Sequence, residues 1–174
     1  EYKPLLAYSG VEHRGTLAVG VGLGGGEVAG AMLHALNHSL AKAMLFLVAG
    51  NLLALYRTRR VAGVRGALRA LPVSGALWVG GLFAITGSPP FGPFVSELMV
   101  LRGAVGGGRW LVVALYLGFL AVAFLGMARA FLAMAQGPSN APAAALEGTG
   151  HPAMTREPAT SILPPLLLGA LVLL

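Results

Sequence analysis

The sequence lacks cysteine altogether and contains little charge. Only 10% of its 174 residues are Asp, Glu, Lys or Arg, whereas a soluble domain carries about 25%. Without cysteine, the chain cannot form disulfides, iron–sulfur clusters or thiolate metal sites of its own. Hydrophobic residues make up 56% of the chain, in several stretches near the spanning length of about 20 residues. These features exclude a single soluble core and indicate an integral membrane protein.

The remaining composition agrees with that class. The net charge of +6 does not indicate nucleic-acid binding, because the basic residues are sparse and flank the apolar stretches, as membrane topology requires. The 26 glycines suit closely packed and broken helices. The chain begins with Glu1, shows no signal-peptide pattern and ends inside an apolar run, so we expect it to be part of a longer protein.

The predicted fold is all-α: a polytopic transmembrane helix bundle with one discontinuous helix. Residues 87–93 contain three prolines and two glycines, which cannot continue a helix. A broken spanning helix places polar groups at mid-membrane; two short helices with a plain loop are the alternative. We expect a transmembrane half of four spans over 1–134 (4–23, 27–56, 74–105 broken at 87–93, and 109–134), an amphipathic surface helix within 57–72, a loop over 135–160, and the start of a further span over 161–174.

The second predicted span contains a stripe of ionisable residues. His34, His38 and Lys42 are spaced i, i+4 and i+8, and Glu27 lies seven residues before His34. On a helix these four share one face and cover ~22 Å. Ionisable groups at membrane depth usually mark an ion or proton path. The alternatives are hydrogen bonds between helices, a metal or haem site (although the stretch lacks the glutamate of HExxH), and a lysine that extends to the surface.

The topology follows from the basic residues, because those on cytoplasmic loops outnumber those on the other side. With alternating spans, only Arg102 and Arg109 lie on the second side. The residues on the first side are Lys3, Arg57, Arg59, Arg60, Arg65, Arg69, Arg129 and Arg156. We therefore expect loops 57–72 and 135–160 to be cytoplasmic.

Four stretches, in order, resemble a known family. They are Lys3-Pro-Leu-Leu-Ala-Tyr-Ser9 leading to Val11-Glu-His13, His34-Ala-Leu-Asn-His38-Ser-Leu-Ala-Lys42 with its continuation to Asn51, Gly87-Ser-Pro-Pro-Phe-Gly92, and Phe94-Val-Ser-Glu97. The chain resembles the antiporter-like proton-translocating subunits of respiratory complex I, membrane-bound hydrogenases and Mrp-type antiporters. The Val-Glu-His and Val-Ser-Glu versions are most similar to hydrogenase-4 component F.

That resemblance implies site residues. Family members contain two inverted five-helix repeats, and this chain is similar to the second repeat plus the start of a following helix. His34, His38 and Lys42 then match the central relay, and Glu97 matches the terminal ionisable residue on the broken helix. Glu12, His13 and Glu27 are further candidates for the proton pathway. Arg14 departs from the apolar residue expected after Glu12-His13, which leaves the role of Glu12, and its own, open.

The expected function is a proton-translocating subunit of a redox-driven complex of the hydrogenase or NADH dehydrogenase type. The alternative is a subunit of a multisubunit sodium/proton antiporter without a redox partner. The subunit is expected to be non-catalytic, with no cofactor, no metal and no nucleic acid. Its expected partners are other membrane subunits, a peripheral redox module, protons or sodium, and lipid. Its expected location is a bacterial or archaeal cytoplasmic membrane.

The topology can be tested with introduced cysteines, because this chain has none. Single cysteines between Arg57 and Arg69 are expected to react with a membrane-impermeant thiol reagent in inverted vesicles. In intact cells they are expected to remain unlabelled. Labelling from outside intact cells would reverse the orientation.

Overall fold

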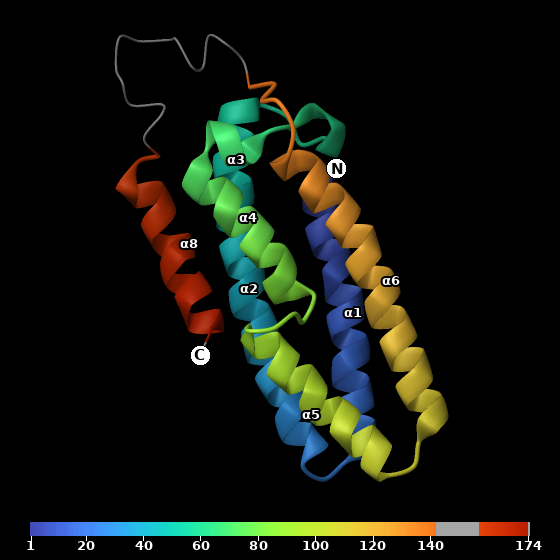
Figure 1. Ribbon diagram of the computed structural model, residues 1–174. Helices are drawn as coiled ribbons and strands as arrows, with labels where there is room; N and C mark the ends of the chain where they lie inside the picture. The colour runs from blue at the N-terminus through green and yellow to red at the C-terminus, as the bar shows by residue number, and fades with distance from the viewer. Residues whose placement is uncertain (142–156, 174) are drawn as a thin grey trace, which may run out of the picture.

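The protein is an elongated bundle of helices, seen here in a computed structural model that describes residues 1–141 and 157–173 (Figure 1). No strand occurs in these residues, which confirms the all-α prediction. The elements in order are α1 (Tyr2–Leu23), α2 (Glu27–Tyr56), a 3-10 turn η1 (Val61–Gly63), α3 (Ala67–Ala70), α4 (Pro72–Ile85), α5 (Gly92–Gly106), α6 (Trp110–Ala135) and α8 (Ala159–Val172).

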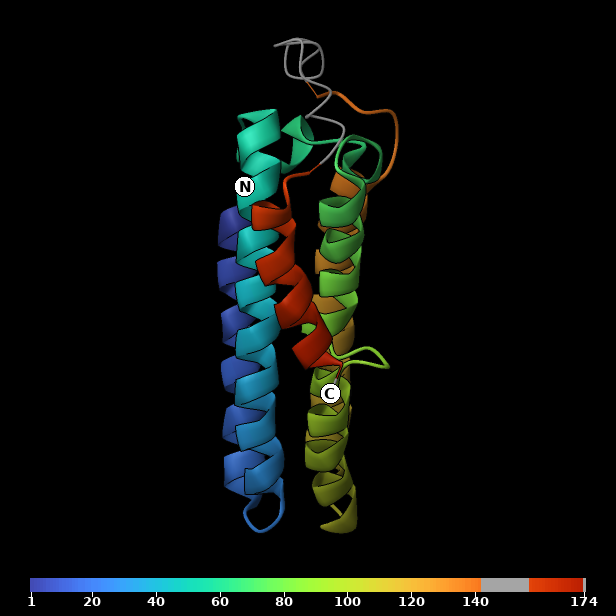
Figure 2. The same ribbon diagram turned by 90° about the vertical axis from the view of Figure 1, so that its left-hand side faces the viewer.

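The long helices run side by side along the bundle (Figures 1 and 2). α1 and α2 form an antiparallel pair, and α2 also packs against α4, α5 and α8. α2 and α6 are long and apolar enough to cross a membrane, whereas α4 and α8 are shorter apolar helices. The sequence and the structure therefore agree on a helix bundle suited to a membrane.

A short non-helical segment separates α4 from α5, and the two helices follow one another along the bundle (Figure 1). Local bonds give partners to two carbonyls at the end of α4. The Ser88 N–H donates to the Phe83 carbonyl over 2.8 Å, and the Gly87 N–H donates to the Ala84 carbonyl over 3.4 Å. Because these carbonyls have partners, the interruption leaves little backbone unsatisfied away from water.

The amphipathic surface helix expected within 57–72 is not formed. The structure has only the three-residue η1 and the four-residue α3 in this segment. Gly66, with φ +66°, lies between them, in a left-handed conformation that interrupts a right-handed helix. The predicted helix was based on the apolar residues between the arginines. Gly63 and Gly66 were the residues in the sequence that disfavoured it.

The apolar core lies toward the end of the bundle that holds the chain's N-terminus. Trp78 of α4 stacks on Phe131 of α6 with ring centroids 4.3 Å apart, and it meets the edge of Tyr2 at 6.0 Å. All three side chains are fully buried, as are Leu45 and Leu52 of α2. These interlocking rings fix α1, α4 and α6 relative to one another.

The last described helix is fastened to α4 by a carboxylate. Glu157, just before α8, accepts hydrogen bonds from the N–H groups of Val73 (2.8 Å) and Ser74 (3.0 Å), and from the Ser74 hydroxyl. Negative charge at a helix N-terminus is stabilising, so this contact caps α4. Arg156 and residues 142–156 of the expected loop lie outside the described residues.

Replacing Glu157 with alanine removes this cap. Glu157→Ala is expected to lower the free energy of unfolding by about 1–2 kcal/mol, the usual cost of losing a helix cap. The measurement is the unfolding midpoint of the detergent-purified protein. Glu1→Ala is the matched control, because the side chain of Glu1 makes no cap bond to α1. Equal midpoints for the two variants would contradict the capping role.

Candidate functional site

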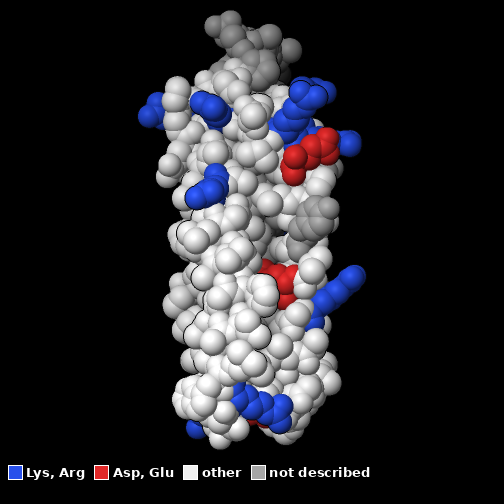
Figure 3. All heavy atoms as spheres, turned by 90° about the vertical axis from the view of Figure 1, so that its right-hand side faces the viewer, with Lys and Arg blue, Asp and Glu red and all other residues white. Residues whose placement is uncertain are grey.

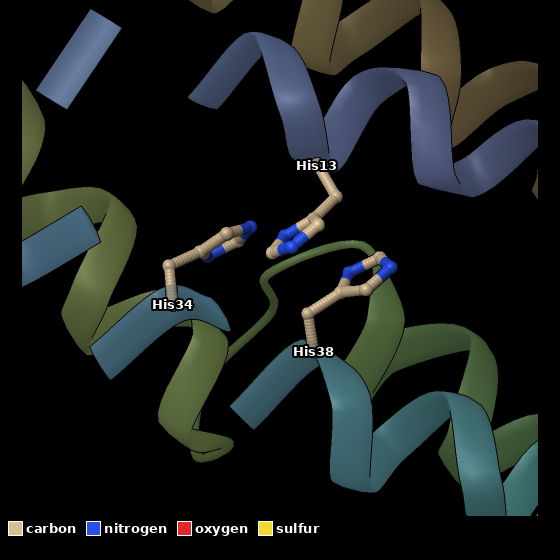
Figure 4. A group of neighbouring side chains, drawn as sticks. All are labelled: His13, His34 and His38. Carbon is tan, nitrogen blue, oxygen red and sulfur yellow. The ribbon is translucent and has the colours of Figure 1, made fainter. Parts of the chain in front are cut away.

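Three histidines from two helices form a stack near the middle of the bundle. His13 of α1 places its ring beside those of His34 and His38, which lie one turn apart on α2 (Figure 4). The ring centroids of His13 and His38 are 4.3 Å apart with planes 12° from parallel, and those of His13 and His34 are 5.1 Å apart at 27°. His34 and His38 are themselves only 2% exposed.

One end of the stack is bonded to α5. The Ser96 hydroxyl donates to the Pro93 carbonyl over 2.7 Å, so its oxygen is free to accept from His34 Nδ1 at 3.0 Å. This arrangement is satisfied when Nδ1 of His34 carries the proton. Neutral His34 then has an Nε2 able to accept another proton. The histidines are thereby linked to the helix that follows the α4–α5 break.

Two nitrogens of the stack have no partner within the described residues. They are Nδ1 of His13 and Nε2 of His38, both buried. A buried unpaired nitrogen is costly and calls for an explanation, such as an exchanging proton or a bridging water. Imidazole can accept a proton at one nitrogen and release one from the other, so the stack is chemically suited to passing protons.

The same three histidines have one nitrogen each within 4.8 Å of the others, which raises the question of a metal. Zinc requires nitrogens converging at about 2.1 Å on a common centre. His13 stacks with its face toward both His34 and His38, whereas the rings of His34 and His38 are tilted by 37°. Lys42 also lies near His13 and His38. Its positively charged ammonium group would repel a divalent metal ion bound to these histidines. The geometry fits proton exchange better than metal coordination.

Lys42 extends from α2 onto α1 at Gly10. A Cβ built on Gly10 would lie 2.8 Å from Lys42 Nζ, so the missing side chain at position 10 provides space for the ammonium group. Lys42 lies one helical turn beyond His38 on α2. The structure therefore brings Lys42 next to the histidine stack.

Glu97 is buried at the α4–α5 break. Its side chain is 6% exposed, and its Oε1 has no partner within the described residues. The carboxyl group lies against Gly87, where any Cβ would overlap it. Glu97 lines a hollow of about 280 Å³ whose other walls include Thr86, Phe94 and Leu120. Its carboxylate thus reaches the segment that interrupts the helix.

Glu12 lies on a different side of α1 from His13. Its Oε2 is buried without a partner in the described residues, and it lines a mainly apolar hollow of about 660 Å³ between α1 and α6. The same hollow contains Thr16 and Tyr116, whose hydroxyls are 3.4 Å apart. Glu12 and Glu97 thus line separate hollows, and Leu120 of α6 borders both of them.

Glu27 is separated from the other candidates. Its carboxyl group lies against Gly103 of α5 and lines a hollow of about 460 Å³ with Arg102. Between Glu27 and His34, α2 buries Gly30 and Ala31, and Gly30 contacts Met99. No polar side chain of α2 bridges this interval.

Some residues of the site were not candidates from the sequence. Ser96 fixes His34, while Gly10 and Gly87 accommodate Lys42 and Glu97. Asn37, 6% exposed, places its amide against Gly92 at the start of α5. Asn37 gave a sequence signal as a polar residue one position from His38 inside an apolar helix, and Gly87 and Ser96 lie in the quoted motifs, which did not indicate their contacts.

The fold and the site define a class: a helical membrane protein with buried titratable side chains at a helix break. The sequence pattern of the family described as "NADH:quinone oxidoreductase/Mrp antiporter, TM" matches residues 1–124. The chain belongs to this family of integral membrane subunits, which confirms the predicted resemblance.

Individual relatives come from several branches of the family. The chain is 37% identical over 122 residues to a hydrogenase-4 component F homolog of Methylacidiphilum infernorum, covering 69% of this chain and 25% of the relative. It is 32% identical over 111 residues to NADH-quinone oxidoreductase subunit N of Desulforudis audaxviator, covering 63% and 22%. It is 27% identical over 141 residues to a protein named as antiporter subunit mnhD2 of Staphylococcus saprophyticus, covering 80% and 28%. The chain thus spans about a quarter of the length of these relatives.

The contact between Gly87 and Glu97 can be tested by adding one methyl group. Gly87→Ala is expected to displace the Glu97 carboxyl group and to strain a residue at φ +62°, by about 1–2 kcal/mol. Under the proton-translocating role proposed below, proton transfer by the assembled protein should fall to the level found when Glu97 is replaced with glutamine. Gly80→Ala is the control, because nothing lies within 4 Å of a Cβ there. Wild-type transfer by Gly87→Ala would show that the position of this carboxyl group is unimportant.

Proposed function

We propose that this chain is the proton-translocating part of a membrane subunit in a redox-driven complex of the hydrogenase or NADH dehydrogenase type. The observation that carries the proposal is the stack of His13, His34 and His38 across α1 and α2. Two of its buried nitrogens lack partners within the described residues. Family membership and the similarity to a hydrogenase-4 component F homolog support it.

The proposed path has a central switch and a terminal site. Lys42 gains or loses a proton according to the charges around it, and the three histidines pass protons through bridging waters. Ser96 holds His34 toward α5, and Glu97 on that helix is the terminal group. Glu12 extends the path toward α6, whereas Glu27 belongs to it only if water fills the apolar interval before His34.

The proposed membrane arrangement treats α4 and α5 as one discontinuous spanning helix. Together with α1, α2 and α6 they would form the second five-helix repeat of an antiporter-like subunit. Loops 57–72 and 135–160 then face the cytoplasm of a bacterial or archaeal cell. The break supports this arrangement, because interrupted helices in transporters place polar groups at mid-membrane, and Glu97 lies at this one.

The proposed partners are other membrane subunits and a peripheral redox module. Each buried titratable group described above is a proton donor or acceptor. Electron transfer is therefore assigned to partner chains, and this subunit is a non-catalytic part of the complex. Lipid surrounds its apolar outer faces.

A second candidate is a subunit of a sodium/proton antiporter without a redox partner. The similarity over 80% of this chain to a protein named as an antiporter subunit favours it. Both functions use the same buried residues. Proton movement that requires an electron donor identifies the redox-driven complex, whereas movement driven by a sodium gradient alone identifies the antiporter.

Lys42→Met should abolish most proton translocation while the complex still assembles. The substitution keeps most of the length of the unbranched side chain but removes the titratable group beside Gly10. The expected loss is at least about tenfold, comparable to removing a general acid–base group. Acidification of inverted vesicles, normalised to assembled complex on native gels, measures it.

Ser39→Ala is the matched control on the same helix. Its hydroxyl is exposed and bonds only to the Ala35 carbonyl of its own helix, over 2.7 Å. This variant is expected to keep wild-type translocation. Normal translocation by Lys42→Met would refute the proposed path.

A further inference from the structure

Arg14 occupies an unusual place on the bundle. It lies near the middle of α1, ~18 Å from Tyr2 and ~14 Å from Leu23 at 1.5 Å per residue, and its side chain is exposed. A guanidinium cannot lose its proton in a protein. Arginines near helix ends extend to the membrane surface, but a charge near the bilayer centre is costly and usually paired.

No ion pair of Arg14 with a carboxylate is found within the described residues. Glu12 is two positions from Arg14 and so about 200° away around the helix; it lines the hollow toward α6, which Val11 and Gly15 border as well. Glu97 lies against Gly87, Glu27 against Gly103, and Glu157 caps α4. Glu1 lies at the start of α1, near the bundle's end.

The charges near Arg14 are positive. Arg14 acts electrostatically on both His13 and Lys42, so this edge of the α1–α2 pair gathers basic groups. In Figure 3, basic side chains gather toward both ends of the molecule, and near mid-height one basic side chain projects beside an acidic group. A cationic edge within the apolar part of the bundle attracts a negative partner.

The surface around Arg14 has the pattern of a helix-docking face. Ala7, Val11, Arg14 and Ala18 follow one another at i, i+4, i+7 and i+11 and are all exposed, Val11 by 64%. Gly15 beside them has nothing within 4 Å of a Cβ. Small residues let a second helix approach closely in a membrane, and one polar side chain fixes its register.

We propose that the stripe Ala7–Val11–Arg14–Ala18 docks a transmembrane helix that presents an aspartate or glutamate at the depth of Arg14. The helix belongs to another segment or subunit of the complete complex. The relatives contain further chain that could supply such a helix, since this chain spans about a quarter of their length. The pairing is a charge-assisted hydrogen bond, which a guanidinium makes with carboxylates in bidentate form.

This inference rests on the membrane location and not on the proposed proton path. Its readouts are contact and assembly, so a failure here is distinguishable from a failure of proton translocation. The docked carboxylate would also neutralise part of the positive charge acting on Lys42. Lipid and a second copy of this chain are the competing occupants.

The first experiment leaves Arg14 intact. A compact photo-crosslinking residue replaces Ala18 in one variant and Val11 in another, each one turn from Arg14, in the complete complex in native membranes. The crosslinked peptide is identified by mass spectrometry. The expected product joins α1 to an apolar transmembrane segment that contains an aspartate or glutamate. Adducts to lipid alone, to α1 of a second copy, or to a segment without a carboxylate overturn the proposal.

The second experiment exchanges the charges. Arg14→Glu is expected to reduce the assembled complex by about tenfold or more, as breaking a buried ion pair does, and Arg14→Lys is expected to retain most of it. Replacing the identified carboxylate with lysine should restore assembly with Arg14→Glu. Arg109→Met, which removes an exposed arginine at the start of α6, is the control. Wild-type assembly by Arg14→Glu, or no rescue by the exchange, overturns the proposal.

Discussion

Removing a polar group from water without giving it a partner costs several kcal/mol, and this cost determines where each polar side chain of the bundle lies. The His34 ring contacts the Ser96 hydroxyl, and His13 stacks on His34 and His38. The ammonium of Lys42 and the carboxyl group of Glu97 lie against glycines. Several polar side chains therefore have a partner, whereas one nitrogen each of His13, His38 and Trp78 and one oxygen each of Glu12 and Glu97 have none within the described residues.

The sequence predicted what local periodicity determines. The spacing of His34, His38 and Lys42 placed them along one side of a helix, and α2 has the predicted bounds of residues 27–56. Proline and glycine located the interruption after α4. The helical class and the family resemblance are confirmed, while the roles of the site residues remain proposals.

The sequence could not predict which helices approach each other. His13 meets His38 only because α1 packs antiparallel to α2, and no pattern within α1 indicates which face is turned inward. Glu27 shared the predicted face of α2 but lies against Gly103, near the far end of α5, whereas His34 meets Ser96 near the start of that helix. The contacts of Gly10 and Gly87 depend likewise on tertiary packing.

The aromatic layer of Tyr2, Trp78 and Phe131 has an electrical consequence. A membrane that stores an ion gradient must resist leakage, and a continuous file of water would short-circuit it. These three rings are fully buried together with Leu45 and Leu52, so this end of the bundle has an apolar interior. Under the proposed function, such an interior would hinder a file of water between the histidines and that end of the bundle.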